Sequence, residues 1–411
     1  MNEIEKSKKN FNIFFKKDLY GRFDDDNNII LSRGGWEDSY VSFPKLFRFC
    51  INYTLRKHWT GYSDSLGHKN TLRALKLLVN YKHGYSYQID NLALTIGNVI
   101  TIGFVARLLK DMLGDVPILT FKPYYPPILK SINYYFNNIR FISNLEDEDV
   151  ILQNIRKNIS ENNIKVLFLS NAIGVEGRTF SEKFWTEVIK FVKAKNDLFL
   201  VIDEGLWFEP LDYPISINNE RIIRVVSLSK KYALAGCKLG FIIGGLNFIK
   251  EFYDYASTNY GGPLSVFFLL TEFIYQFEYA YYSQNKNSAL KILFTEYNIP
   301  TESLNILYND FVKTTQKNRK KINTNQKILS EWIKKNNTLI EEAFNFSGIN
   351  VFIKLKNTTK AYDLFNKLIE KKVSVMPSSC LGDENDGMIR ITLLEQSNLL
   401  RCGLNIIGNN L

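Results

Sequence analysis

Residues 227–241 constrain the fold and chemistry of this chain more than any other stretch. An apolar run over residues 222–226 precedes them and indicates a short buried strand. A hydroxyl group and several lysines follow among small residues: Ser227, Lys230, Lys231 and Lys238. A hydroxyl and a second cation near a lysine indicate an anionic ligand that is bound close to a reactive amine. The stretch therefore predicts a buried strand followed by a ligand-binding loop.

The composition is that of a globular protein that can bury a large core. Of the 411 residues, 45% are apolar and 23% are charged, so we expect one large domain and one smaller domain. The formal net charge of +10 is spread along the chain, and its densest basic cluster, residues 317–321, indicates a solvated helix face. We therefore expect no nucleic-acid partner.

Cysteines, histidines and apolar segments bear on metals, membranes and location. The four cysteines and three histidines show no ligand spacing, which predicts no metal site and fits a reducing cytoplasm. The first residues lack an apolar signal core. The most apolar long segment, residues 264–282, is interrupted by Glu272, Gln276 and Glu278, which favours a buried or interface helix over a membrane span. We expect a cytoplasmic protein without a membrane partner.

Several apolar runs end in polar or small residues. The run before Gly97 predicts a strand, and a helix follows it, so a phosphate could sit on free amide groups at that helix start. Residues 198–203 predict a strand that ends at Asp203, and a buried carboxylate there needs a cationic or donor partner. Further strands are predicted at 116–121, 164–170, 346–355 and 388–392; helices are predicted from an N-cap at Ser181 to about residue 193 and over 301–345.

The loop of residues 227–241 resembles the lysine motif of class I/II aminotransferases, S-x-S-K-x-x-x-L-A-G-x-R-x-G. These are fold-type I enzymes that use pyridoxal 5′-phosphate. The resemblance implies that Lys230 forms the Schiff base with the cofactor and that Lys231 is a bystander. It also implies that Ser227 and Lys238 hold the cofactor phosphate. The family has arginine where this chain has Lys238, which keeps the charge but loses the bidentate fork.

Other segments match the family in the same order along the chain. By this resemblance Asp203 pairs with the pyridine nitrogen and Arg390, in Ile-Arg-Ile, binds the substrate carboxylate. The resemblance also implies that Asn171, in Asn-Ala-Ile-Gly where the family has N-P-x-G, contacts the phenolate oxygen and helps to bind the substrate. The resemblance further implies that the turn of Gly97, Asn98 and Val99 binds the cofactor phosphate. It implies that Tyr125, or alternatively Tyr124, stacks on the cofactor ring. Tyr62 would reach the cofactor phosphate of the partner subunit.

Together these matches imply a fold-type I α/β architecture. It has a mainly parallel seven-stranded sheet with flanking helices, formed by residues 61–295, and a small α+β domain from both chain ends, residues 1–60 and 296–411. The family is dimeric, so a homodimer with shared active sites is implied. The expected function is a pyridoxal-phosphate-dependent aminotransferase that acts on an amino acid and a 2-oxo acid.

One departure keeps other reactions open. Leu206 stands where the family has a tyrosine that donates to the phenolate oxygen, and the neighbouring Trp207 cannot be assumed to replace it. A lyase, decarboxylase, cyclase or oxidase on the same scaffold is therefore an alternative. A cofactor-binding regulator is a third possibility, but such regulators carry an extra winged-helix domain, and the segment before Tyr62 leaves no room for one.

Overall fold

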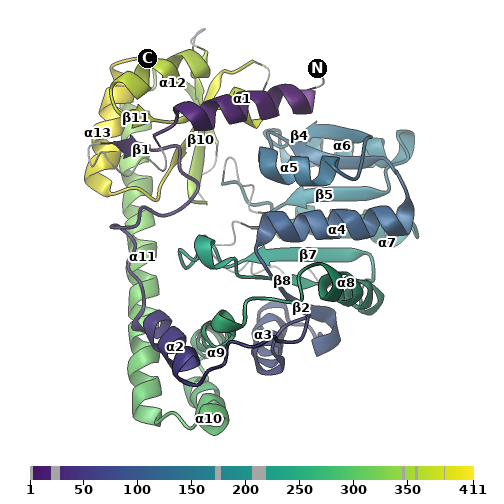
Figure 1. The fold of residues 1–411 in the computed structure, drawn as a ribbon. Coiled ribbons are helices and arrows are strands. Elements are labelled where there is room, and N and C mark those ends of the chain that lie inside the picture. The colour runs from purple at the N-terminus through teal and green to yellow at the C-terminus, as the bar shows by residue number, and fades with distance from the viewer. Residues whose placement is uncertain are drawn as a thin grey trace. The chain divides into compact units, whose positions relative to one another are not determined.

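The computed structural model describes residues 3–19, 28–171, 177–205, 219–344, 348–356, 360–383 and 385–411 (Figure 1). The chain divides into two compact units. Unit 1 comprises Met1–Val41, Asp115–Phe180 and Arg319–Leu411, and unit 2 comprises Ser42–Gly114 and Ser181–Asn318. The domain boundaries expected at residues 60 and 295 stay predictions.

The main sheet has seven strands: β2 (Leu92–Thr95), β3 (Ile118–Lys122), β4 (Ile139–Ser143), β5 (Val166–Ser170), β6 (Phe199–Glu204), β7 (Ile222–Ser227) and β8 (Gly240–Ile243). Their order is β2-β8-β7-β6-β5-β3-β4. β8 is antiparallel to β2 and β7, whereas β6 is parallel to β7, and β3 is parallel to β4 and β5. Nearly continuous apolar runs form these strands because both faces of such a sheet are covered. The predicted mainly parallel α/β fold is confirmed.

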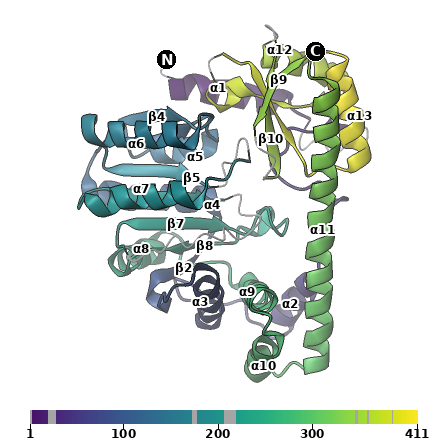
Figure 2. The same cartoon turned by 180° about the vertical axis from the view of Figure 1, so that it is seen from behind.

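Unit 2 surrounds its strands with helices, which include α2 (Lys45–Arg56), α3 (Lys69–His83), α4 (Asn98–Leu113), α7 (Glu182–Ala194), α8 (Leu246–Asn259), α9 (Phe268–Ser283), α10 (Lys286–Tyr297) and the 3-10 turns η1 (Ile89–Asn91), η2 (Ala235–Cys237) and η3 (Ser265–Phe267). α3 and α9 lie side by side (Figures 1 and 2). The predicted N-cap of α7 is confirmed, because the Ser181 hydroxyl accepts a hydrogen bond from the Phe184 amide at 3.2 Å.

Unit 1 holds a second sheet of four strands in the antiparallel order β12-β13-β10-β9. Its further elements are α1 (Glu3–Lys17), β1 (Ile29–Ile30), α5 (Pro126–Asn133), α6 (Glu148–Glu161), β9 (Ile340–Phe344), β10 (Asn350–Leu355), α12 (Ala361–Glu370), β11 (Val373–Ser374), β12 (Met376–Pro377), η4 (Ser378–Leu381), β13 (Met388–Thr392) and α13 (Ser397–Gly408). β1 pairs with β11 in parallel, so a segment from the N-terminal part of the chain joins one from the C-terminal part in this unit.

The long helix α11 (Thr301–Lys335) corrects one expectation. The sequence predicted a helix over residues 301–345, but the helix ends at Lys335 and residues 340–344 form β9. β9 pairs with β10 in the antiparallel sheet, and this pairing over a long sequence separation outweighs the local helical pattern.

Candidate active site

The predicted cofactor residues of unit 2 gather where parallel strands end. Asp203 on β6 is in register with Val225 on β7, and Ser227 ends β7 two residues later. Gly240 on β8 faces both Ser227 and Thr95, the last residue of β2. In open α/β sheets, ligands bind outside the carboxyl ends of the strands, and this edge therefore has the position of a binding site.

Gly97 joins β2 to α4 at this edge. Its φ of +86° lies in the left-handed region, which favours glycine. A Cβ atom added there would lie 3.6 Å from the Cα and 3.4 Å from the Cδ of Lys238. The first turn of α4 carries no acidic residue. The arrangement combines a helix N-terminus, a close backbone approach and an exposed lysine, which suits a phosphate group.

Asp203 is held by two donors from its own unit. Its Oδ1 accepts hydrogen bonds from Asn98 Nδ2 at 2.6 Å and from the Gly205 amide at 2.8 Å. Gly205 allows the Asn98 side chain to lie there, because a Cβ at residue 205 would be 2.4 Å from Asn98 Nδ2. The sequence predicted Asn98 only through the turn at the start of α4, so its side-chain contact with Asp203 is an addition.

The lysine loop begins directly after β7. The Leu228 amide donates to the Leu239 carbonyl at 3.1 Å, which closes the loop at its base. Ser227 Oγ accepts from the Ser229 amide at 3.1 Å, so this serine shapes the loop as well as ending the strand. Lys230 is half-buried, and its neighbour Lys231 is buried and ion-paired with Glu278 of α9. Lys231 therefore has a structural contact of its own, which the sequence did not predict.

Arg390 on β13 is the predicted carboxylate-binding residue, and it lies in unit 1. Its side chain is buried, and one guanidinium nitrogen, Nη2, donates to the Ser32 carbonyl. Nε has no hydrogen-bond partner among the described residues. Burial lowers the pKa of Arg390 to about 10, although the Tyr125 hydroxyl and Asp18 favour the charged form. A buried cation with an unused donor fits a carboxylate ligand.

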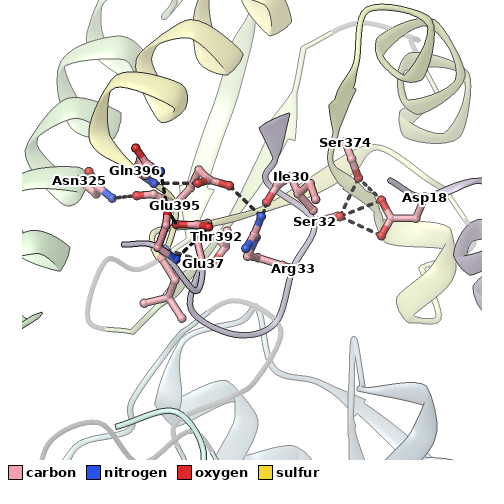
Figure 3. A network of polar contacts seen from close by, with 12 residues as sticks. Asp18, Ile30, Ser32, Arg33, Glu37, Asn325, Ser374, Thr392, Glu395 and Gln396 are labelled. Carbon is pink, nitrogen blue, oxygen red and sulfur yellow. Dashed lines mark hydrogen bonds and ion pairs between the residues drawn. The ribbon is translucent and has the colours of Figure 1, made fainter. Parts of the chain in front are cut away.

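Buried carboxylates flank the Ser32 segment on both sides (Figure 3). Asp18 accepts hydrogen bonds from the hydroxyls of Ser32, at 2.9 Å, and Ser374. Arg33 pairs with Glu395 at 3.2 Å. The segment that contacts Arg390 is thus tied to the C-terminal part of unit 1, and nothing in the sequence patterns indicated this network.

Three further predicted residues lie in the described part of the chain. Tyr124 is buried, with its ring stacked on Phe141 at 5.4 Å, whereas Tyr125 is 36% exposed at the start of α5. This favours Tyr125 over Tyr124 as the ring that meets a ligand. Asn171 accepts from the Phe180 amide at 3.3 Å, and its buried Nδ2 has no hydrogen-bond partner in the described residues.

Two other predicted positions lie in unit 2, at exposed or half-buried sites. Tyr62 has a fully exposed side chain, and Val99 is half-buried in the first turn of α4. Leu206 and Trp207 lie outside the described residues.

The sequence matches the family model for aminotransferase class I and II over residues 52–402. The chain belongs to this family. Its members are pyridoxal-phosphate-dependent enzymes with a fold-type I architecture, and the cradle at Gly97 and Lys238 and the oriented carboxylate of Asp203 fit such a cofactor.

Solved structures of aminotransferases share the fold. A single mutant of Thermus thermophilus aspartate aminotransferase has a TM-score of 0.76 at 16% identity, covering 98% of this chain and 96% of that one. An aromatic aminotransferase from Pyrococcus horikoshii has a TM-score of 0.74 at 14% identity, covering 94% of this chain and 96% of that one. A search of curated protein sequences finds no match.

Within the described ranges, no group of three or more His, Cys, Asp and Glu side chains is placed to hold a metal ion. The same residues contain no helix with the length and apolarity that a membrane crossing requires.

Proposed function

We propose that this member of the family is a pyridoxal-phosphate-dependent aminotransferase that transfers an amino group between an amino acid and a 2-oxo acid. The observation that carries the proposal is the grouping in unit 2 of Gly97, Lys238 and the Asn98–Asp203 pair around the loop of Lys230. When bound, pyridoxal phosphate supplies an electron-poor ring that stabilises negative charge at the substrate α-carbon.

Each residue of unit 2 has a separate task in this proposal. The amides at Gly97, Asn98 and Val99, together with Ser227 and Lys238, hold the phosphate group. Asp203, oriented by its two donors, keeps the ring nitrogen protonated. The Lys230 amine would hold the cofactor covalently, and it would move a proton to and from the substrate α-carbon.

Three further residues have proposed roles toward the substrate and the cofactor ring. Arg390 binds the α-carboxylate, which is supported by its burial and its unused Nε. Tyr125 offers an exposed aromatic face for the ring, and the Asn171 amide offers a buried donor for the phenolate oxygen. The two substrate classes share a carboxylate, so one arginine serves both.

A homodimer with shared sites is part of the proposal. Its support is the fully exposed side chain of Tyr62, which a second subunit would cover when the tyrosine reaches that subunit's cofactor phosphate. Nucleic acid and membrane are not proposed as partners.

A different reaction on the same scaffold is the second candidate. It rests on Leu206, which replaces the tyrosine that the family places near the phenolate oxygen. Loss of that donor changes the electronics of the cofactor and could favour decarboxylation, elimination, cyclisation or oxidation over transamination.

The deciding experiment incubates cofactor-loaded protein with pooled amino acids and no 2-oxo acid. Transamination converts the cofactor to its amine form with one 2-oxo acid per site. Release of carbon dioxide, ammonia or peroxide without that conversion supports the second candidate. We expect Lys230→Ala to lower turnover by about 10²- to 10⁴-fold, while Lys250→Ala, at an exposed position of α8, leaves it unchanged. Covalent attachment of the cofactor to Lys230→Ala protein would disprove the assignment of this lysine.

A further inference from the structure

The second lysine of the loop has a buried partner on α9. Lys231 Nζ donates to Glu278 Oε1, and the two side chains are 5% and 3% exposed. The hydroxyl of the next residue, Tyr232, donates to the same oxygen. Two consecutive side chains of the loop are therefore attached to one carboxylate.

A second cation completes this buried cluster. Lys82 Nζ on α3 lies 3.8 Å from Glu278 Oε2 and 4.1 Å from the centre of the Tyr282 ring. Burial raises the pKa of Glu278, but Lys231 and Lys82 outweigh that effect and leave the pKa below its ordinary value. The carboxylate is thus ionised and compensated, as a buried charge has to be.

The backbone next to this cluster adopts a costly conformation. Ala233 follows Tyr232 and has a φ of +57°, in the left-handed region that residues with a Cβ rarely adopt. Such a conformation persists only where the surroundings enforce it. Here the Tyr232 ring also packs against Phe311 at 5.7 Å and Phe47 at 6.4 Å. The loop is therefore held firmly at residues 231 and 232.

We infer that Glu278 is a positioning residue: it anchors Lys231 and Tyr232 to α9, so that Lys230 and not Lys231 receives the cofactor. The inference rests on the proposed function, because it concerns which of two adjacent amines forms the Schiff base. The Lys231 amine is enclosed and bound to the Glu278 carboxylate, so it is not available to attack the cofactor aldehyde as a nucleophile. Glu278 thereby decides the choice without contact with the cofactor.

Reductive labelling tests this choice directly. The lysine amine condenses with the cofactor aldehyde to a C=N bond with loss of water. Borohydride then adds hydride to the carbon, the nitrogen takes a proton, and peptide mapping locates the stable secondary amine. In the unchanged protein we expect the label on Lys230. In Glu278→Gln we expect the fraction on Lys231 to rise about tenfold or more, because a charge-assisted anchor is lost.

A matched control lies on the same helix. Glu272 is also buried in α9, but the hydroxyl that donates to it, at 2.6 Å, belongs to Tyr297 of α10 and not to the loop. In Glu272→Gln we expect only Lys230 to carry the label, as in the unchanged protein. A general loosening of α9 would instead affect both variants equally, and that result would overturn the positioning role.

A second variant covers the case in which Glu278→Gln fails to fold. Lys231→Met leaves Glu278 paired one-to-one with Lys82, so no buried charge loses its compensation. We expect its labelling at Lys230 to slow by about tenfold, because one of the two loop anchors is gone. Labelling at the original rate would contradict the inference.

The failures of the two proposals are distinguishable. A label on Lys230 that does not change in any variant overturns the positioning role and leaves the proposed function intact. An unchanged protein that takes the label on neither lysine overturns the proposed function, and the positioning role with it.

Discussion

The Asn98 side chain helps to orient Asp203. Asn98 donates to Oδ1 at 2.6 Å, and the glycine at position 205 leaves space for that contact. Without such a hydrogen bond, an aspartate side chain at the end of a strand could adopt several rotamers. The hydrogen bond thus links the phosphate turn of α4 to the residue proposed to face the ring nitrogen.

Removal of this hydrogen bond should be measurable in turnover. We expect Asn98→Ala to lower kcat about 10- to 100-fold, since hydrogen bonds to charged groups contribute about 1.5–3 kcal/mol. Steady-state kinetics with saturating cofactor would measure the effect. Asn247→Ala, at an exposed position of α8, is the matched control. An Asn98→Ala protein with unchanged kcat would show that Asp203 needs no orienting donor.

Local patterns in the sequence identified Asp203, Gly97 and Lys230 because each stands at the end of an apolar run or in a distinctive turn. They could not identify what these residues contact. Asn98 and Asp203 are 105 positions apart, and Lys231 and Glu278 are 47 apart. Only the folded sheet and helices bring such partners together, so local patterns could not predict these side-chain contacts.

At the scale of elements, helix α9 places two carboxyl groups and one side-chain amide in an apolar environment. The interruptions at Glu272, Gln276 and Glu278 correctly indicated a buried helix, and all three side chains are buried. Each of the two carboxylates has a different partner. Glu278 faces lysines and is ionised, whereas burial raises the pKa of Glu272 to about 8, with the Tyr297 hydroxyl opposing and Glu296 adding to the shift.

Glu272 should make the stability of the protein depend on pH. Its folded pKa of about 8 exceeds the ordinary glutamate pKa of 4.5, so the native state holds this proton more tightly than the unfolded state. Its contribution is therefore fully present below about pH 4.5 and is lost as pH rises through about 8, at no more than about 1.4 kcal/mol per pH unit.

Denaturant unfolding from pH 5 to 8 measures this contribution. The decline in the free energy of unfolding should be shallower in Glu272→Gln than in the unchanged protein. The groups that act on this carboxyl group belong to α10, α3 and α2: Tyr297, Glu296, Arg73 and Cys50. Equal slopes in the two proteins would show that Glu272 is ionised at neutral pH.

Element boundaries show where local patterns fail. The strands β2, β3, β5, β6 and β7 and the Ser181 cap were predicted because apolar runs and capping residues are local signals, whereas no strand was predicted at β4 or β8. The end of α11 at Lys335 was not, because the pairing of β9 with β10 overrides helical preference in residues 340–344.

At the scale of the whole molecule, the proposed dimer with shared sites predicts that two inactive variants can complement each other. Two inactive variants, Lys230→Ala and Tyr62→Ala, should complement each other when mixed and refolded at limiting cofactor concentration. Random reassociation makes about half of the dimers mixed. If each site takes Tyr62 from the partner subunit, every mixed dimer has one intact site of its two, which restores about a quarter of the activity. Activity that stays at the level of the separate variants would contradict shared sites.

The network of Figure 3 also bears on the order in which the protein is made. Asp18 and Arg33 find their partners at Ser374 and Glu395, near the other end of the chain. Ribosomes add about 5–20 residues per second, so the early segment waits on the order of tens of seconds for these partners. During most of translation, unit 1 therefore lacks both the hydrogen bond from Ser374 to Asp18 and the ion pair between Arg33 and Glu395. The segment that supports Arg390 can reach its final state only after synthesis is almost complete.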